Sequence, residues 1–256
     1  MKLSTILTIL KPICTIDNRA TEDLDIHHLL IDSRLLGAHP EQTIFFAIKT
    51  EKNDGARYIE ELYNKGVKVF IISHSIEALQ TLAIYQRERF AGQVIGITGS
   101  NGKTVVKEWL YQLLKNDYHI IRSPRSYNSQ IGVALSVWQL GEEIDSHKGK
   151  FTHTPLAIFE AGISQPGEME RLEKMIKPTI GVITYIGVEH GENFSSMVEK
   201  RAEKMKLFAR CPIVVEDPSH QNVRTCAAVL RVLGYDEETI SARVLHQTHE
   251  TVMEIN

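Results

Sequence analysis

Cysteine is scarce in this sequence. Its 256 residues include three cysteines, Cys14, Cys211 and Cys226, and no two of them have the short spacing of a metal-binding or redox pair. A disulfide scaffold or a cysteine-based zinc site is therefore not expected, and a reducing cytosol suits the composition.

A surplus of one charge is also absent, because 29 Lys and Arg residues stand against 32 Asp and Glu, for a net charge of −3. Dedicated nucleic-acid-binding proteins usually carry a basic surplus, so nucleic acid is not an expected partner. No apolar run approaches the ~18 residues that span a membrane. The apolar N-terminus is interrupted by Ser4, Thr5 and Thr8 and lacks a cleavage site, which predicts a short helix ending at Pro12 rather than a signal peptide. We expect a soluble, cytoplasmic protein without membrane insertion.

Strand-like runs alternate with helical patterns along the chain. The predicted strands are 44–48, 67–72, 94–97, 119–122, 156–160, 180–186 and 213–215, and the main predicted helices are 58–63, 75–89, 102–115, 131–140, 167–176, 195–209 and 220–233. This alternation is typical of α/β proteins with a mostly parallel sheet covered on both faces. Ala91-Gly92 resembles a linker, which predicts two domains, 1–90 and 91–256, and the polar segment 141–154 is expected to be an exposed loop.

Residues 98–104, with the sequence TGSNGKT, have the pattern of a phosphate-binding loop. They follow an apolar strand and open an amphipathic helix, where glycines and a helix N-terminus present N–H groups to phosphate oxygens. The strict G-x4-G-K-T spacing would need glycine at Ile97, so only the shorter form is present. The alternative, a glycine-rich turn with an incidental lysine, is disfavoured by the strand and helix context. The expected nucleotide-binding residues are Gly99, Ser100, Asn101, Gly102, Lys103 and Thr104.

Polar residues follow two other predicted strands. Glu160 ends a largely apolar strand, and His190 follows the 180–186 strand by four residues. The carboxyl ends of parallel strands meet at one edge, so Thr104, Glu160 and His190 could converge on a cation at the γ-phosphate. Taken singly, Glu160 could be a solvated or helix-capping carboxylate and His190 ordinary polar surface. Their shared placement favours the site.

Lys204 lies within the predicted helix 195–209. The apolar stripe of that helix is expected to consist of Val198, Ala202, Met205 and Ala209, which places Lys204 on its flank. From the residues alone, a solvated lysine is the expected interpretation.

Several segments together resemble the Mur ligases of peptidoglycan synthesis. They are IDSR at 31–34, FFAIK at 45–49 with NDG at 53–55, TGSNGKT at 98–104, NSQIGV at 128–133, FEAG at 159–162 with PGE at 166–168, and ITYIGVEH at 183–190. They occur in order over most of the chain. The resemblance is greatest to the branch that adds D-alanyl-D-alanine, and within it to the ligase half of chains fused to an alanine racemase.

The resemblance implies an ATP-dependent amide-bond ligase that joins a UDP-N-acetylmuramoyl-tripeptide to D-alanyl-D-alanine through an acyl phosphate. An N-terminal domain, 1–90, would bind the UDP-sugar, and a central domain, 91–256, would bind ATP and Mg²⁺. The residues that match the uridine-nucleotide site are Ser33, Arg34, Lys49, Asn53, Asp54 and Gly55.

The same resemblance assigns roles in the central domain. Asn128 and Ser129 would face the substrate and phosphates, and Asn222 would contact the adenine nucleotide. Glu160 and His190, with Thr104, match the magnesium ligands. Lys204 matches a lysine that the family carbamoylates. The residues with an implied catalytic role are Lys103, His190 and Lys204.

Two features depart from the family pattern. The sequence ends at Asn256, where the central domain should end and a third domain should follow, and the predicted strand 213–215 runs almost directly into residues 217–222, where extra strands are usual. We therefore expect a shortened ligase that binds nucleotide or UDP-sugar but ligates little by itself, or one that a partner completes. The alternatives are a non-catalytic nucleotide- or UDP-sugar-binding module and a ligase resembling folylpolyglutamate synthetase; the long segment before the phosphate loop disfavours the second.

Overall fold

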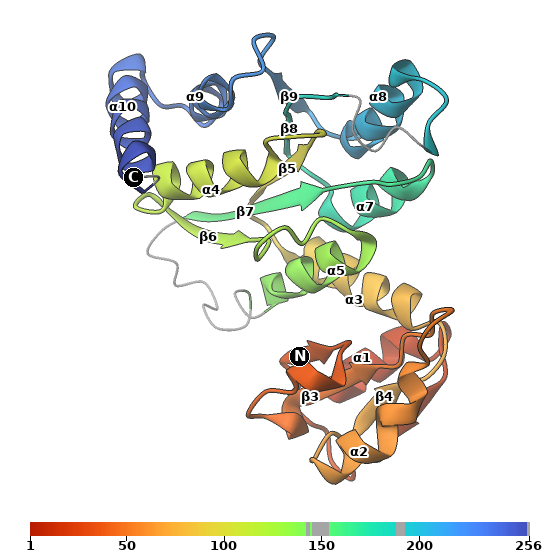
Figure 1. Cartoon of the computed structure of the whole chain (residues 1–256). Helices are drawn as coiled ribbons and strands as arrows, with labels where there is room; N and C mark the ends of the chain where they lie inside the picture. The colour runs from red at the N-terminus through yellow and green to blue at the C-terminus, as the bar shows by residue number, and fades with distance from the viewer. Residues whose placement is uncertain (142–143, 145–153, 188–192, 255–256) are drawn as a thin grey trace.

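Two β-sheets, joined by one long helix, organise the chain (Figure 1). A computed structural model describes residues 1–141, 144, 154–187 and 193–254. The smaller, N-terminal sheet has the strand order β1-β4-β3-β2, in which β1 is antiparallel to β4 and the other pairs are parallel. Its elements are α1 (Leu3–Leu10), β1 (Ile16–Asn18), β2 (His28–Leu30), β3 (Thr43–Phe46), α2 (Ile59–Asn64) and β4 (Val69–Ile71), with 3-10 turns at Ser33–Leu35, Pro40–Gln42 and Gly55–Tyr58.

The larger sheet has five parallel strands in the order β6-β7-β5-β8-β9. These strands are β5 (Gln93–Thr98), β6 (Tyr118–Arg122), β7 (Thr154–Ala161), β8 (Ile180–Ile183) and β9 (Ile213–Glu216). The helices are α4 (Lys103–Leu114), α5 (Gln130–Trp138), α7 (Glu168–Ile176), α8 (Met197–Met205), α9 (Asn222–Val232) and α10 (Glu237–Glu254), with a 3-10 turn at Lys206–Phe208 after α8.

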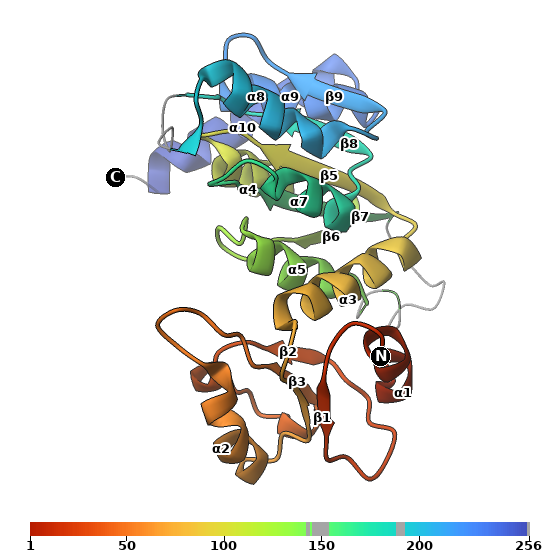
Figure 2. The same ribbon diagram turned by 90° about the vertical axis from the view of Figure 1, so that its right-hand side faces the viewer.

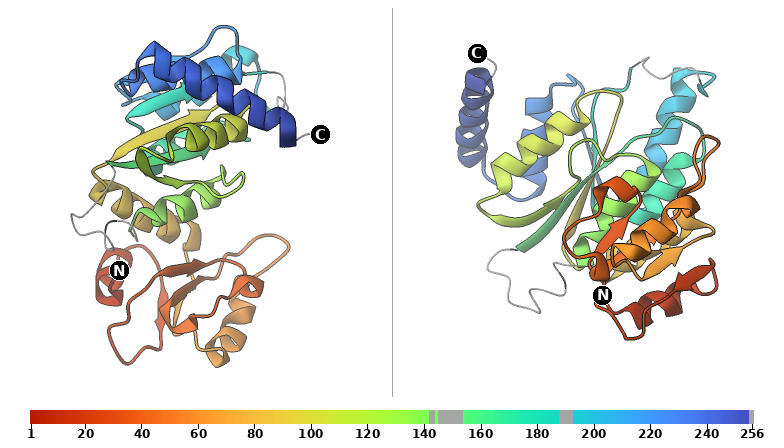
Figure 3. Two further views of the ribbon diagram at one scale, coloured as in Figure 1. Left: turned by 90° about the vertical axis from the view of Figure 1, so that its left-hand side faces the viewer. Right: turned by 60° about the horizontal axis from the view of Figure 1, so that its bottom comes forward.

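Helices cover both faces of the larger sheet. Figures 1 and 3 show α4, α9 and α10 on one face and α5 and α7 on the other. The central strands β5, β7 and β8 are buried almost throughout, which accounts for their nearly continuous apolar sequences. Arg243 of α10 donates to Leu113 O at 2.6 Å and so fixes α10 to the end of α4. The predicted α/β class with a mostly parallel sheet is confirmed.

Helix α3 (Ser75–Arg89) links the two sheets and packs against both sides of the junction. Figure 2 shows it between α5 and the N-terminal elements. Its buried Leu79 and Leu82 belong to one apolar cluster that includes Ile44 of the smaller sheet and Val133 of α5. The buried guanidinium of Arg87 donates to the carbonyls of Ile176 and Lys177 at 2.7 Å each, which ties the end of α3 to the end of α7. The predicted boundary between residues 90 and 91 stays a prediction.

The structure departs from the expected elements in several places. Strand β8 ends at Ile183 rather than at 186, because the chain there leaves the ladder and Tyr185 O accepts hydrogen bonds from Ser100 N and Asn101 N instead. Strands β1 and β2, of three residues each, and helix α10 were not predicted. The expected helix 195–209 is divided into α8 and a 3-10 turn, and most of the expected loop 141–154 lies outside the described residues.

Across the described part of the chain, every helix is too short or too polar to cross a membrane.

Truncating the Leu82 side chain tests how much the packing of α3 between the two sheets stabilises the protein. Leu82→Ala leaves a cavity in the shared cluster, and we expect the free energy of unfolding, measured in urea, to fall by roughly 2–5 kcal/mol. Leu35→Ala is the matched control, because Leu35 is 68% exposed and the same change there should cost about 0.5 kcal/mol or less. Equal losses in the two variants would contradict a packing role for α3.

Candidate functional site

The predicted phosphate loop lies between β5 and α4 and needs glycine at two positions. Gly102 has a φ of 86°, and a Cβ there would lie 2.6 Å from Asn222 Oδ1. Gly99 has a φ of 153°, and a Cβ there would lie 1.9 Å from Thr184 Oγ1. Side chains are thus excluded by both conformation and space. Asn222, at the start of α9, is held against the loop.

Lys103 is the first residue of α4 and folds back over the loop. Its Nζ donates to Gly99 O at 2.9 Å and to Ser100 O at 2.8 Å. The ammonium therefore lies beside the backbone that would surround phosphate oxygens, at the positive end of a helix.

Thr104 and Glu160 meet as the sequence predicted. Thr104 Oγ1 donates to Glu160 Oε2 at 3.0 Å, and the Glu160 side chain is fully buried at the carboxyl end of β7. Magnesium takes oxygen ligands and commonly one or two carboxylates, with phosphate and water completing the octahedron. The two side chains therefore fit a magnesium ion. The expected third ligand, His190, lies outside the described residues.

A buried lysine that was not predicted lies beside Glu160. Lys107 Nζ lies 2.9 Å from Glu160 Oε1 in an ion pair and donates to Ser123 O at 2.8 Å and to Arg125 O. The available signal was its position on α4, three residues after Thr104, which places both side chains on one face of the helix.

The stripe predicted for α8 was wrong. Val198 is 79% exposed, whereas Lys200 and Lys204 are each 3% exposed. Lys204 Nζ donates to Gly99 O at 3.0 Å, and Lys200 Nζ donates to Gly187 O at 2.7 Å. This face of α8 is polar yet buried because its lysines donate to carbonyl groups of the phosphate loop and of the segment after β8. Lys204 is accordingly not a solvated lysine.

The Lys204 amine has an altered proton affinity. Its pKa is lowered from 10.5 to about 8, chiefly by burial and in smaller part by the nearby positive charges of Lys103 and Lys200. A substantial share of the amine is therefore neutral near pH 8, which makes Lys204 more nucleophilic than a surface lysine.

A pocket of about 430 Å³ opens beside the loop. Lys103, Lys200 and Lys204 line it from one side, and Asn128 and Ser129 line it from the start of α5. Ser129 Oγ accepts from Gly132 N at 3.2 Å and caps the helix, so its position is fixed by the fold. Asn128 O accepts from Gly162 N at 2.8 Å, which ties this segment to the end of β7.

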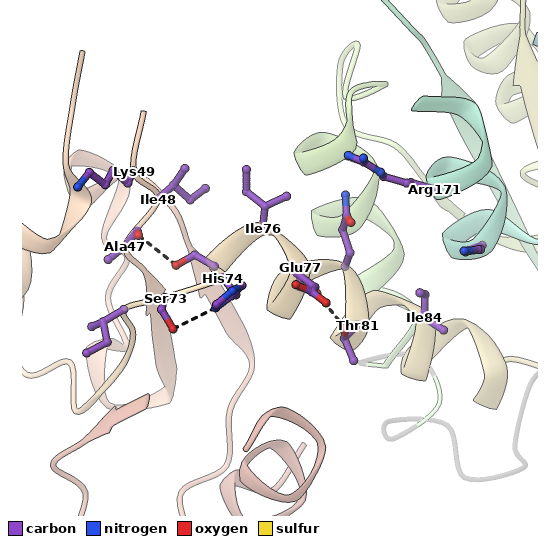
Figure 4. Close-up of a pocket in the computed structure, with 14 residues that line it drawn as sticks. Ala47, Ile48, Lys49, Ser73, His74, Ile76, Glu77, Thr81, Ile84 and Arg171 are labelled. Atoms are coloured by element: carbon purple, nitrogen blue, oxygen red, sulfur yellow. Dashed lines mark hydrogen bonds between the residues drawn. The ribbon is translucent and has the colours of Figure 1, made fainter. Parts of the chain in front are cut away.

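A larger pocket, of about 930 Å³, lies between the carboxyl edge of the smaller sheet and helices α3 and α7 (Figure 4). Lys49 and His74 line it from the N-terminal side, and Arg171 and Lys174 line it from α7. Ile76 lines both pockets, so the two are adjacent. Three of its lining side chains, Lys49, Arg171 and Lys174, are cationic and one, Glu77, is anionic, so the lining has a positive surplus that suits an anionic ligand.

Comparisons with known proteins identify the family of the chain. Residues 97–254, more than half of the chain, match the Mur ligase middle domain. The chain belongs to the Mur ligase family. It is 27% identical to the UDP-N-acetylmuramoyl-tripeptide–D-alanyl-D-alanine ligase of Bacillus subtilis strain 168 over 83% of this chain and 48% of that protein. It is 28% identical to the ligase of the same name from Rickettsia prowazekii strain Madrid E, over 80% of this chain and 49% of that one.

Solved Mur ligase structures share the fold. A MurF from Acinetobacter baumannii superposes with a TM-score of 0.69 at 20% identity, over 88% of this chain and 51% of that one. A MurF from Thermotoga maritima in complex with ADP gives a TM-score of 0.62 at 26% identity, over 78% and 48% of the two chains. The chain spans about half the length of the curated relatives that it matches.

Of the residues that the Mur ligase resemblance assigned to the uridine nucleotide, the structure brings only Lys49 into the larger pocket. Asn53, Asp54 and Gly55 shape the turn behind it, since Asn53 O accepts from Thr50 N at 2.8 Å and Asp54 Oδ1 accepts from Ala56 N at 3.0 Å.

Ser33 and Arg34 follow β2 on the same carboxyl edge of the smaller sheet. The Arg34 guanidinium is paired with its neighbour Asp32, at 2.6 Å between Nη2 and Oδ2, and lowers the pKa of that carboxyl. The binding roles of these two residues, and of Asn53, Asp54 and Gly55, stay predictions.

The altered pKa of Lys204 should appear in the pH dependence of stability. Below about pH 8 the folded and unfolded chains both carry the proton, and the cost of a buried ammonium is fully present. Between about pH 8 and pH 10.5 the folded chain has released the proton that the unfolded chain still holds, so the folded state gains stability as pH rises. Relative to Lys204→Met, the wild type should gain up to about 3 kcal/mol across this window in urea unfolding. A difference that does not change with pH would contradict the assignment.

Proposed function

We propose that this protein is an ATP-dependent amide-bond ligase of peptidoglycan precursor synthesis, which adds D-alanyl-D-alanine to a UDP-N-acetylmuramoyl-tripeptide. The observation that carries the proposal is the convergence of Lys103, Thr104 and Glu160 at one phosphate loop, where Lys204 also donates to Gly99 O. The names of the matching relatives supply the substrates. The cytoplasmic location expected from the sequence stays a prediction.

The loop is proposed to bind ATP. Lys103 and the N–H groups at the start of α4 would neutralise the β- and γ-phosphates, and Asn222, beside Gly102, would contact the adenine nucleotide. Thr104 and Glu160 would hold Mg²⁺, with His190 as the expected further ligand. When bound, Mg²⁺ supplies positive charge to the phosphoryl oxygens.

The larger pocket is proposed to bind the UDP-sugar. Its diphosphate would be bound by the nitrogen-bearing side chains of Lys49, His74, Arg171 and Lys174. The two pockets are adjacent at Ile76, so the attached peptide could extend into the smaller pocket beside the loop. The peptide carboxylate would then lie near the γ-phosphate of ATP, beside Asn128. Holding these two reactants in contact is the main contribution that a protein makes to such a transfer.

The reaction proposed for this site has two steps. The substrate carboxylate attacks the γ-phosphorus and releases ADP, giving an acyl phosphate, and the amine of D-alanyl-D-alanine then attacks the acyl carbon and releases phosphate. Positive groups held in place before the reaction stabilise the charge that moves onto the phosphoryl oxygens. Lys103 and the loop N–H groups are the groups in this chain that can do so.

Lys204 is proposed to be carbamoylated. Carbamoylation requires a neutral amine, and burial beside Lys103 and Lys200 lowers the pKa of Lys204 to about 8. The modification would replace a cation by a carbamate anion close to the loop. Intact-mass measurement under carbon dioxide should show an addition of about 44 Da in the wild type and no such addition in Lys204→Met.

Two alternatives remain from the sequence. A non-catalytic nucleotide- or UDP-sugar-binding module would need the pockets but not the metal-ligating pair, so the buried contact between Thr104 and Glu160 favours an enzyme. A ligase resembling folylpolyglutamate synthetase is disfavoured by the N-terminal sheet, whose edge forms one wall of the larger pocket.

Single substitutions should weaken the binding of one proposed ligand without affecting the other. In calorimetric titrations, Lys103→Ala should weaken MgATP binding by about 10- to 100-fold, because charge-assisted hydrogen bonds to phosphate are lost, and leave UDP-muramoyl-peptide binding unchanged. Arg171→Ala should do the reverse, weakening only the UDP-sugar by about tenfold.

Lys115→Ala, at the exposed end of α4, is the control and should bind both ligands normally. Wild-type protein that binds neither ligand would refute the proposed function. Loss of both ligands from either single variant would refute the division into two pockets.

A further inference from the structure

A fully buried ammonium group lies at the centre of the site just described. Lys107 is 0% exposed, and its Nζ contacts the carbonyl oxygens of Ser123 and Arg125 and lies 2.9 Å from Glu160 Oε1. It also lies 3.2 Å from the more exposed carboxylate of Glu108. Two carbonyl oxygens and two carboxylate oxygens thus surround the ammonium.

A buried ion pair of this kind is an unusual way to stabilise a protein core. Lysine is seldom fully buried, and a buried ion pair is often no more stabilising than apolar side chains of similar volume. Glu160 Oε1 also lacks an aligned hydrogen bond within the described residues, so it is held by the charge of Lys107. A requirement for stability alone therefore does not explain why Lys107 and Glu160 are both buried here.

The contacts of Lys107 join three segments that the proposed reaction must align. Lys107 belongs to α4, the helix that begins at the phosphate loop. Glu160 ends β7, and its other oxygen, Oε2, accepts from Thr104. Segment 123–129 ends with Asn128 and Ser129, which line the smaller pocket. Its first residue also contacts the end of β7, because Ser123 Oγ accepts from Glu160 N at 3.4 Å.

We propose that Lys107 is a positioning residue that fixes the Glu160 carboxylate and clamps segment 123–129 to the phosphate-loop helix, so that the metal–nucleotide site and the substrate-facing segment form one unit. This inference rests on the proposed function. With Oε1 held by Lys107, the carboxylate cannot rotate, and Oε2 stays beside Thr104 where a metal ligand is needed. With the Ser123 and Arg125 carbonyls held by the same ammonium, Asn128 keeps its place in the smaller pocket.

The test compares ADP binding with and without magnesium in the full chain. Titration of MgCl₂ at fixed ADP gives the half-saturating Mg²⁺ concentration, and titration of ADP in EDTA gives the metal-free affinity. For Lys107→Met we expect half-saturation to rise at least about tenfold, the metal-free ADP affinity to stay within about twofold of wild type, and the affinity for UDP-N-acetylmuramoyl-tripeptide to fall at least about threefold. A role confined to stability would lower the melting temperature and move none of the three.

Lys115→Met, on the exposed end of the same helix, is the matched control and should behave as wild type. If Lys107→Met does not fold, Lys107→Arg decides the question. It keeps the positive charge but moves it, because the guanidinium is larger and planar, and half-saturation should rise about threefold in folded protein.

Wild-type half-saturation in either folded variant overturns the role of Lys107. Absence of MgADP binding by the wild type contradicts the proposed function itself, and this proposal with it.

Discussion

The buried carboxylate of Glu160 is the group on which the arrangement of the site depends. A charge removed from water must be compensated, and here one oxygen faces the Lys107 ammonium while the other accepts from the Thr104 hydroxyl. Both partners come from α4, one turn apart, so the helix that begins at the phosphate loop is oriented by the end of strand β7. The orientation of Lys103 follows, because it precedes Thr104 on the same helix. A single charged contact thereby relates the loop, the sheet and the helix.

The smaller sheet is attached to this framework through α3. Apolar side chains of that helix share a cluster with β3 and α5, and Trp138 Nε1 donates to His27 O at 2.9 Å across the same junction. The edge of the smaller sheet and helix α7 are thus held on either side of the larger pocket. The relative placement of the two pockets is set by ordinary packing some distance from the chemistry.

Much of this could be predicted from the sequence, where local chemistry decides the structure. The phosphate loop could be found because Gly99 and Gly102 are required by backbone conformation, and the position of Glu160 because polar residues that end buried strands are out of pattern. Lys107 and Lys200 could not be found in this way, because hydropathy places lysine on the surface and only tertiary contacts with carbonyls and a carboxylate explain their burial. The strands β1 and β2 are too short to give a period, and the end of β8 depends on hydrogen bonds to a loop distant in sequence.

Glu160 is proposed to bind magnesium beside the nucleotide. The most direct measurement is the affinity for ADP of wild-type protein and of Glu160→Gln, each with and without Mg²⁺, by calorimetry. We expect that Mg²⁺ tightens ADP binding to the wild type and that Glu160→Gln binds ADP with a single affinity, independent of Mg²⁺, close to the metal-free value of the wild type. Tightening by Mg²⁺ that persists in folded Glu160→Gln would contradict this proposal.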